Sequence, residues 1–374
     1  MASPALQRLR RHARRNTLFS PTTLADAVRR LGFVQADPIR APARAQDLIL
    51  RHRVRGYRAG DLERRFARLG LEEDFLYAYG FMPAETRALL HPRLDPQGAL
   101  GLEGLAAEVL AFVRTRGPTH PRDLEKRFGS ERAVNGWGGF SKATTRALEA
   151  LHHLGLLRVA HRRDGIRLYE AARPLMAAAV PAERARRAVM RVARILAPVS
   201  PVSLRGALAL MARRNPDLGP LGPVVAAALR EGELEEDTIE GERYVWPAVE
   251  GIEDRGPGAR DVRLLAPFDP LVWDRRRFEH LWGWAYRFEA YTPPPRRLFG
   301  YYALPLLWGD AVIGWANLAL PGGRLEVSLG FVGHEPRGPS FRRALDAELA
   351  RMEGFLAAGT LALPGRPARP DPCG

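Results

Sequence analysis

Residues 156–170 read LLRVAHRRDGIRLYE and predict a β-hairpin. Two strand-like runs, Leu156–Ala160 and Ile166–Glu170, flank the turn Arg162-Arg163-Asp164-Gly165. Asp-Gly is a strong signal for a short hairpin because both residues accept the positive φ angles of a tight turn. The stretch therefore predicts two antiparallel strands joined by a basic tip.

Three helices are predicted in the sequence before this hairpin. Apolar residues recur at helical spacing in Leu105–Arg116, and Ser141–Leu154 carries an amphipathic stripe. Between them, a turn leads into the short helix Pro121–Phe128, which the loop Gly129–Phe140 follows. Helix, turn, helix, helix and two-stranded wing is the order of a winged helix-turn-helix unit.

The start of the second helix recurs along the chain. Pro21, Pro121 and Pro201 each begin a Pro-x-x-Leu stretch after a polar residue, and such a cap before a proline favours a helix start. Recurrence predicts a repeated unit. The third copy has helices Arg184–Leu196, Pro201–Ala212 and Leu221–Glu231 and the wing strands Leu234–Thr238 and Glu242–Trp246; the first copy has Leu6–Arg15, Pro21–Leu31 and the apolar stretch Phe33–Ile39, which could be a wing or a helix.

The pattern changes after about residue 260. Strand-like runs replace the helical repeats, Trp308-Gly309-Asp310 predicts a hairpin turn, and Glu335–Ala358 predicts a closing helix. The expected strands are Val262–Leu265, Phe288–Tyr291, Tyr301–Leu307, Ala311–Leu318 and Leu325–Leu329. We expect an α+β fold of three tandem winged helices, residues 1–98, 99–180 and 181–258, and a β-rich C-terminal domain, residues 259–374.

Charge points to a polyanionic partner. Lys and Arg number 57 against 42 Asp and Glu, which gives a formal net charge of +15. Genome composition explains why arginine outnumbers lysine, but it does not explain the excess over acid. Nucleic acid is the first candidate partner, and an anionic membrane surface is the second.

Several classes of protein are excluded by composition. The one cysteine, Cys373, leaves no disulfide framework, iron–sulfur cluster or cysteine-based zinc site. No apolar run approaches the ~18–20 residues of a membrane span, so we expect a soluble, cytoplasmic protein. Motifs for binding ATP, NAD or a metal are missing, and we expect no cofactor and no metal.

The middle and third wings differ in charge. His161, Arg162 and Arg163 at the middle wing suit contact with phosphate, although a solvated hairpin tip explains any single arginine equally well. The third wing carries an acidic run, Glu235-Glu236-Asp237, that would repel phosphate. We expect that third unit to pack structurally or to bind protein.

Two polar residues, Gln35 and Asp37, interrupt the apolar run 31–39. A spacing of two in an extended segment puts both side chains on one face, and Pro38 favours that extended form. They could satisfy backbone groups at a turn. Alternatively, a carboxylate beside an amide is a plausible DNA-facing active site, since basic residues follow at Arg40, Arg44, Arg51, His52 and Arg53.

At this motif the chain resembles the winged-helix DNA glycosylases of the YcaQ/AlkZ family, which repair alkylated and crosslinked DNA. The resemblance extends over nearly the whole chain, in separate blocks that stand in the same order. These blocks are residues 31–38, residues 43–50 with Gln46 inside them, Pro267–Arg275, Tyr286–Tyr291 and Phe299–Pro305.

The resemblance implies tandem winged helices in a C-shaped arrangement, with Gln35 and Asp37 as the catalytic pair. Asp rather than Gln at position 37 resembles the YcaQ-type branch. Where such proteins often have a histidine, this chain has Tyr77 and Tyr79, which could replace it or could simply pack in the core.

The chemistry suits these residues. A base alkylated at N7 of guanine or N3 of adenine is cationic and leaves readily, so one carboxylate and a positioned water suffice for hydrolysis. With only Lys126 and Lys142 in the chain, Schiff-base lyase chemistry is disfavoured. We therefore expect a monomeric, monofunctional glycosylase that acts on double-stranded DNA with alkylated bases or crosslinks. The alternative is a winged-helix transcriptional regulator without enzymatic activity.

Overall fold

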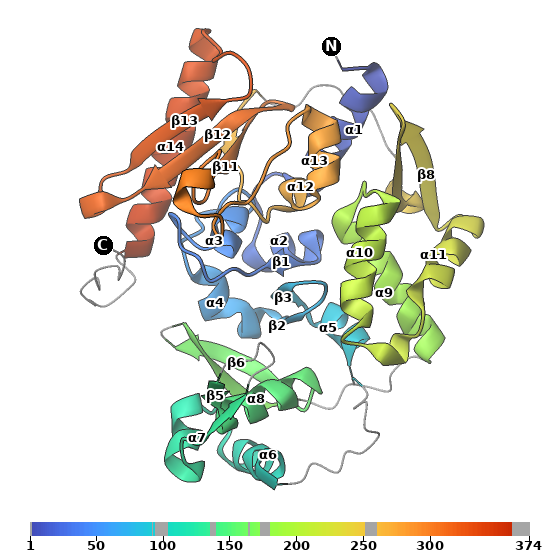
Figure 1. Ribbon diagram of the computed structural model, residues 1–374, viewed down its shortest axis with the longest axis vertical. Coiled ribbons are helices and arrows are strands. Elements are labelled where there is room, and N and C mark those ends of the chain that lie inside the picture. The colour runs from blue at the N-terminus through green and yellow to red at the C-terminus, as the bar shows by residue number, and fades with distance from the viewer. Residues whose placement is uncertain are drawn as a thin grey trace.

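Helices and strands are mixed along the whole chain (Figure 1). The structure, a computed structural model, describes residues 2–91, 93, 104–134, 140–163, 165–172, 180–250 and 260–360. The predicted turn residue Asp164 and the single Cys373 lie outside the described residues. No helix in the described ranges is long and apolar enough to cross a membrane.

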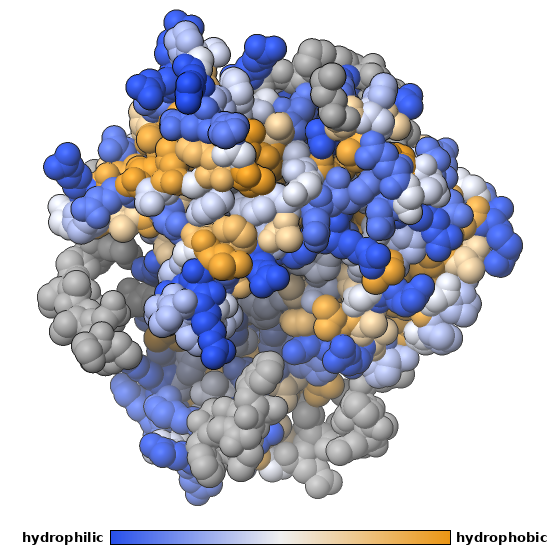
Figure 2. All heavy atoms as spheres, turned by 45° about the horizontal axis from the view of Figure 1, so that its top comes forward, coloured by the Kyte–Doolittle hydropathy of each residue, from blue (hydrophilic) through white to orange (hydrophobic). Residues whose placement is uncertain are grey.

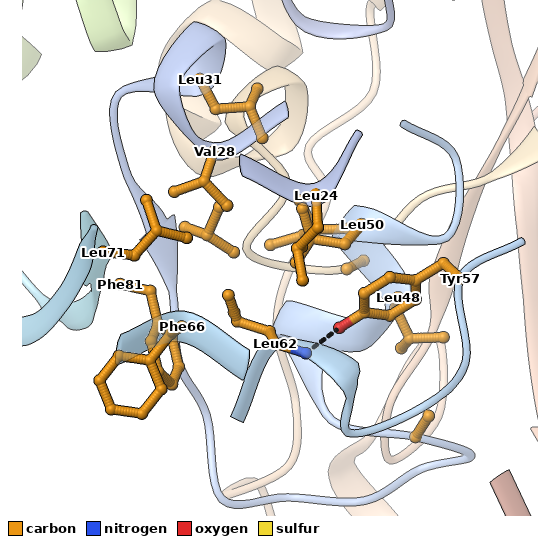
Figure 3. Packing of buried hydrophobic residues seen from close by; sticks show 14 of the residues in the cluster. Leu24, Val28, Leu31, Leu48, Leu50, Tyr57, Leu62, Phe66, Leu71 and Phe81 are labelled. Atoms are coloured by element: carbon orange, nitrogen blue, oxygen red, sulfur yellow. Dashed lines mark hydrogen bonds between the residues drawn. The ribbon is translucent and has the colours of Figure 1, made fainter. Parts of the chain in front are cut away.

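The first segment combines helices with a three-stranded antiparallel sheet in the order β1-β3-β2. Its core gathers leucines from α2 and α3 around Phe66 and Phe81, and Tyr57 accepts a hydrogen bond from the Leu62 backbone N–H (Figure 3). The elements are α1 (Pro4–Thr17), α2 (Leu24–Leu31), β1 (Val34–Gln35), α3 (Ala45–Leu50), α4 (Asp61–Arg65), β2 (Leu71–Phe75), β3 (Tyr79–Pro83) and α5 (Ala84–Leu90), with a 3-10 turn at Phe66–Leu69.

The next two segments share one order of elements, helix, helix, helix and antiparallel hairpin, and the second segment adds the β4–β5 pair between its second and third helices. In both, a single bridge ties the residue before the second helix to the last strand, Thr119 to Tyr169 and Val199 to Val245. The elements are α6 (Gly104–Arg116), α7 (Pro121–Phe128), β4 (Arg132–Val134), β5 (Phe140–Lys142), α8 (Ala143–His153), β6 (Leu157–Arg163) and β7 (Ile166–Ala171), then α9 (Pro181–Leu196), α10 (Pro201–Ala212), α11 (Leu221–Arg230), β8 (Leu234–Ile239) and β9 (Glu242–Pro247).

The last segment forms a four-stranded antiparallel sheet in the order β10-β11-β12-β13. The long helix α14 lies beside this sheet and packs against β10 (Figure 1). The elements are β10 (Val262–Leu264), α12 (Pro270–Trp273), α13 (Arg275–Trp282), β11 (Leu304–Trp308), β12 (Ala311–Ala319), β13 (Glu326–Phe331) and α14 (Pro339–Thr360).

Polar caps fix the starts of the predicted helices. His120 and Ser200 cap α7 and α10, each with proline in the first turn, as the pattern predicted. The predicted start at Pro21 is wrong: α2 begins at Leu24, because the Thr23 side chain accepts the hydrogen bond from Asp26 N. In this copy Pro21 therefore comes before the capping residue Thr23, whereas Pro121 and Pro201 follow their capping residues.

Two predictions about strands are also wrong. The region Gly129–Phe140, expected as a loop, contains β4 and the start of β5, which pair from Val134 with Phe140 to Arg132 with Lys142. Phe288–Tyr291, expected as a strand, forms none. Instead, the Glu289 carboxylate accepts hydrogen bonds from the backbone N–H groups of Leu298, Phe299 and Gly300, which closes this stretch into a loop.

Hydrophobic clusters cross the boundaries between segments. One cluster joins Leu24 and Leu48 of the first segment to Val109 of the second and Val262 of the last. Another packs Leu6 and Leu9 of α1 against Phe278 and Trp284 of the last segment. The outer face viewed in Figure 2 is largely hydrophilic, with apolar side chains gathered over the region of the C-terminal sheet.

Two successive buried carboxylates, Glu73 and Asp74, connect the segments. Glu73 on β2 pairs with Arg162 and, at 2.9 Å, with Arg167 of the β6–β7 hairpin. Asp74 pairs with Arg93, whose guanidinium also donates to the backbone oxygen of His153 and, in the third segment, to the Asn215 side chain. The first three segments therefore meet at one strand.

Asp74 is held in its charged form. Burial alone would raise the pKa of this carboxyl group, but the nearby His152, the hydrogen bond from His91 and the charge of Arg93 hold the pKa well below its usual value. The contacts are short: His91 Nε2 lies 2.6 Å from Asp74 Oδ2, and Arg87 Nε lies 3.2 Å from the same atom. Removing one of these partners would leave the buried charge only partly compensated.

We predict that Arg93→Met lowers the free energy of unfolding by about 3–5 kcal/mol, because Asp74 Oδ1 would lose the charge of Arg93, and the buried Asn215 and the His153 carbonyl oxygen would lose their donor. Arg116→Met is the matched control, since Arg116 pairs with Asp123 at the exposed surface and should contribute only about 0–1 kcal/mol. Denaturant unfolding followed by tryptophan fluorescence measures both. Equal midpoints for the two variants would contradict this role of Arg93.

Candidate active site around Gln35 and Asp37

The chain enters the candidate site through a sharp turn after α2. Gly32 ends the helix with φ of 74°, and the next residues form β1 on the edge of the three-stranded sheet. Gln35 pairs with Gly80, and Ala36 N donates to the carbonyl oxygen of Tyr79 at 2.9 Å. A Cβ atom at position 80 would collide with the carbonyl oxygen of Val34, so glycine is required for this pairing.

The buried side-chain amide of Gln46 fixes the backbone of Asp37. The backbone N–H of Asp37 donates to Gln46 Oε1 at 3.2 Å, and Gln46 Nε2 donates to Glu63 Oε1 at 3.0 Å. Only 2% of Gln46 is exposed. The Gln46 side chain therefore links the Asp37 backbone to the Glu63 carboxylate on α4, which leaves the Asp37 backbone little freedom to move.

The Asp37 side chain has one occupied oxygen and one free one. Oδ1 accepts the backbone N–H of Ile39 at 2.9 Å, across Pro38, so the turn-capping interpretation of this aspartate is confirmed. Among the described residues, Oδ2 has no hydrogen-bond partner. Partial burial raises the pKa of Asp37, and the hydrogen bond from Ile39 offsets part of that increase.

Gln35 presents a second unsatisfied group. Its Oε1 atom is buried and has no hydrogen-bond partner among the residues that the structure describes. An unpaired buried carbonyl oxygen costs about 1–3 kcal/mol, and such groups are commonly satisfied by a water or a ligand. The amide is therefore suited to hold a molecule that donates a hydrogen bond.

Tyr302 brings the far end of the chain to the same place. Burial and the negative charge of Asp37 both raise the pKa of the Tyr302 hydroxyl. That hydroxyl is buried and unpaired within the described ranges, and the residue is only 3% exposed. The rings of Phe288 and Phe268 extend from Tyr302 as a wall of edge-to-face contacts with centroid distances of 5.4 and 5.0 Å.

Ion pairs connect the β6–β7 hairpin to the residues that hold Asp37. Glu63, which holds Gln46, also pairs with Arg44 and lies 3.9 Å from Arg162. Arg162 in turn pairs with the fully buried Glu73. A continuous set of polar contacts therefore runs from Asp37 through Gln46 and Glu63 to the hairpin.

Three of the eight basic residues expected to contact DNA lie inside the protein. Arg53 is fully buried and donates to the carbonyl oxygens of Thr17 and Ile49 and to Asp269. His52 bonds to the Leu264 carbonyl oxygen, and Arg51 pairs with buried Glu348. In this structure these three side chains tie α3 to the C-terminal segment and cannot reach a phosphate near Asp37.

The remaining expected contacts divide into two groups. Arg44, Gln46 and Arg162 are occupied by the carboxylates of Glu63 and Glu73 described above. Arg40 and Arg163 are exposed and His161 is half-buried, so these three side chains are open to solvent.

Tyr77 and Tyr79 have packing roles. Tyr77 is buried between the rings of Phe33 and Trp273, with centroid distances of 5.0 and 4.9 Å. Tyr79 donates its hydroxyl to Glu73 at 2.8 Å, and Arg167 stacks over its ring. Neither tyrosine hydroxyl is directed to Asp37 by any contact among the described residues.

Tyr302 and the positioning role of Gln46 were not predicted from sequence. Nothing near Gln35 in the sequence points to a tyrosine in the last segment, although Tyr302 lies inside the resembling block Phe299–Pro305. Among the described residues, no group of three or more His, Cys, Asp or Glu side chains could hold a metal ion.

We predict that Gln46→Met lowers the free energy of unfolding by about 1–3 kcal/mol, because the Asp37 N–H and the Glu63 carboxylate would both lose a buried partner. Gln7→Met is the control, since the side-chain amide of Gln7 bonds at the exposed surface. Denaturant unfolding measures both variants. If Gln46→Met were as stable as Gln7→Met, the amide would not be needed to hold Asp37.

A comparison with protein-family models matches residues 28–355 to the family described as DNA glycosylase AlkZ-like. The match begins within α2, just before Gln35, and ends within α14. It therefore includes every residue described in the candidate site.

Proposed function

Because the chain belongs to the AlkZ-like DNA glycosylase family, we propose that it is a monofunctional glycosylase that hydrolyses the N-glycosidic bond of alkylated bases in double-stranded DNA. The observation that carries this proposal is the half-buried Asp37, whose Oδ2 atom has no hydrogen-bond partner among the described residues, two positions from Gln35, whose buried amide oxygen is likewise unpaired there. N7-alkylguanine and N3-alkyladenine are the proposed bases, and unhooking of interstrand crosslinks made through the same atoms follows from the same chemistry.

Cleavage is proposed to begin with departure of the alkylated base, which carries a positive charge and leaves as a neutral molecule. The electrons of the glycosidic bond move to the base, and positive charge develops on the sugar. Asp37 Oδ2 stabilises that charge, since a preorganised anion in a partly desolvated site acts more strongly than one in water.

Water completes the reaction. Gln35 Oε1 accepts one hydrogen bond from the water, the water oxygen attacks C1′ of the sugar, and Asp37 takes the released proton. The products are a free base and an abasic site. Lys142 pairs with Glu125 in the second segment, away from the contacts that surround Asp37, which supports hydrolysis without a lysine Schiff base.

DNA contact is proposed through the exposed basic residues. We interpret the first three segments as winged helices in a C-shaped arrangement, with Arg40, His161 and Arg163 open to contact DNA phosphates. The protein would act as a monomer on chromosomal DNA, in the cytoplasm and on the nucleoid when bound.

We predict that Asp37→Asn slows release of N7-methylguanine from duplex DNA by about 10²–10⁴-fold while duplex binding is retained. Asp26→Asn, on the exposed surface of α2, is the control and should release base at the wild-type rate. Single-turnover release and duplex binding are measured on the same oligonucleotide. Binding without release by the wild-type protein, on alkylated and crosslinked substrates alike, would favour a DNA-binding regulator instead.

Tyr302→Phe should separate stability from activity. Its buried hydroxyl is unpaired, so phenylalanine removes a desolvation penalty and the variant should be at least as stable as wild type. We expect base release to slow about tenfold, because the hydroxyl would donate to the reacting water or sugar beside Asp37.

The matched control for this tyrosine is Tyr286→Phe. The Tyr286 hydroxyl is also buried but already donates to the Ala303 carbonyl oxygen at 2.8 Å, so its loss should reduce stability and leave release nearly unchanged. Unfolding midpoints and single-turnover rates are needed for both variants. Equal release rates for the two would remove Tyr302 from the proposed site.

A further inference from the structure

A cavity of about 400 Å³ lies away from Asp37 at the other end of α3. It opens between the loop 51–58 that follows α3 and the C-terminal half of α14, with β10 beside them. Four arginines line it, together with the rings of Tyr57 and Phe355; the arginines are Arg51, Arg58, Arg263 and Arg351. Its volume falls within the range of ~300–1,000 Å³ that small-ligand sites occupy.

Carboxylates neutralise only part of this charge. Glu348 is fully buried and bonds both Arg51 and Arg351, the second at 2.9 Å. Asp261 pairs with Arg263 at 2.7 Å but is shared with Arg14 of α1. These two carboxylates therefore pair with four guanidinium groups, three of which line the cavity, and the fourth lining arginine, Arg58, pairs with neither of them.

Two of the lining arginines, Arg58 and Arg51, have N–H groups that could still bind an anion. Arg58 is exposed, and no described acidic side chain pairs with its guanidinium. Arg51 has a side chain only 4% exposed, and its buried Nε atom has no hydrogen-bond partner in the described part of the chain. Burial and the charges of Arg263 and Arg351 lower the pKa of Arg51, against the opposing effect of Glu348. The lining is thus short of negative charge.

The floor of the cavity is open at two glycines. A Cβ atom built at Gly56 or at Gly354 meets no other atom within 4 Å. Tyr57 and Phe355 form the apolar side, with their rings nearly parallel and 6.4 Å apart. The space can therefore receive a compact anion against the arginines without displacing a side chain.

We propose that this cavity is a second, anion-binding site that takes a phosphate group. Guanidinium groups match the oxygens of phosphate with paired N–H donors. One or two anionic oxygens of a phosphate would supply the negative charge that the cavity lining lacks. The phosphate comes either from a free phosphate ester or from the DNA backbone. The site uses none of the residues assigned to base release, so it stands independently of the proposed function.

Two variants test the site by different means. Arg58→Gln removes the unpaired guanidinium, and Gly354→Phe fills the cavity while leaving every charge in place. The matched controls are Arg55→Gln, an exposed arginine on the same loop that does not line the cavity, and Gly206→Phe, at an exposed position of α10 with no atom near its Cβ. Titration calorimetry with inorganic phosphate and with a deoxynucleoside 5′-monophosphate covers the free source. The salt dependence of binding to an undamaged duplex covers the backbone source.

A free ester as the ligand predicts that wild type and both controls bind phosphate or the monophosphate, and that both test variants bind about tenfold more weakly or not at all. A backbone phosphate predicts no binding of the free anions, but a slope of log affinity against log salt that falls by about one in both test variants and in neither control. The proposal is overturned if the test variants match their controls in both measurements. It is also overturned if only Arg58→Gln binds differently from its control. In that case Gly354→Phe would fill the cavity without affecting the anion, so the anion would bind elsewhere.

Discussion

Two successive buried carboxylates on one short strand constrain the structure. Side chains alternate along a strand, so Glu73 and Asp74 of β2 face opposite ways. Glu73 meets Arg162 and Arg167 of the β6–β7 hairpin, and Asp74 meets Arg93, which reaches the third segment through Asn215. Buried charges of this kind contribute little net stability but tolerate few arrangements, because each must keep its partner. They fix how the first three segments sit together.

The candidate site depends on this placement. Arg162, held by Glu73, lies beside Glu63, and Glu63 holds the Gln46 amide that fixes the Asp37 backbone. The backbone of the acting carboxylate is thus positioned before any substrate arrives, while Asp37 Oδ2 and Gln35 Oε1 are left unsatisfied. Tyr302 approaches from the last segment with a third unpaired group. Unsatisfied polar atoms are costly in a folded protein, and here two such buried atoms, on Gln35 and Tyr302, accompany a half-buried carboxylate whose charge acts on the Tyr302 hydroxyl.

Local signals predicted much of the fold but little of what surrounds the site. Caps and prolines located α7 and α10, and Asp-Gly located the β6–β7 hairpin. Phe288–Tyr291 was wrongly expected as a strand. The hydrogen bonds that bend this stretch are donated to the Glu289 carboxylate by backbone N–H groups about ten positions later, which no local pattern shows. Gln35 and Asp37 stood out by their own sequence. The basic residues after them did not reveal their burial, since net charge does not show which arginines pair with buried acids, as Arg51 and Arg53 do.

The central claim is that the Asp37 carboxylate, with its pKa raised by burial, acts directly in base release. The most direct measurement is the single-turnover rate of N7-methylguanine release as a function of pH, for wild type and for Asp37→Asn, corrected for release without enzyme. The wild-type rate should fall as the pH drops through the pKa of Asp37, with a midpoint above the ~3.9 of a free aspartate, and the residual rate of the variant should lack that step. A variant that kept the same acidic step would contradict the account, because the titrating group would then be another residue.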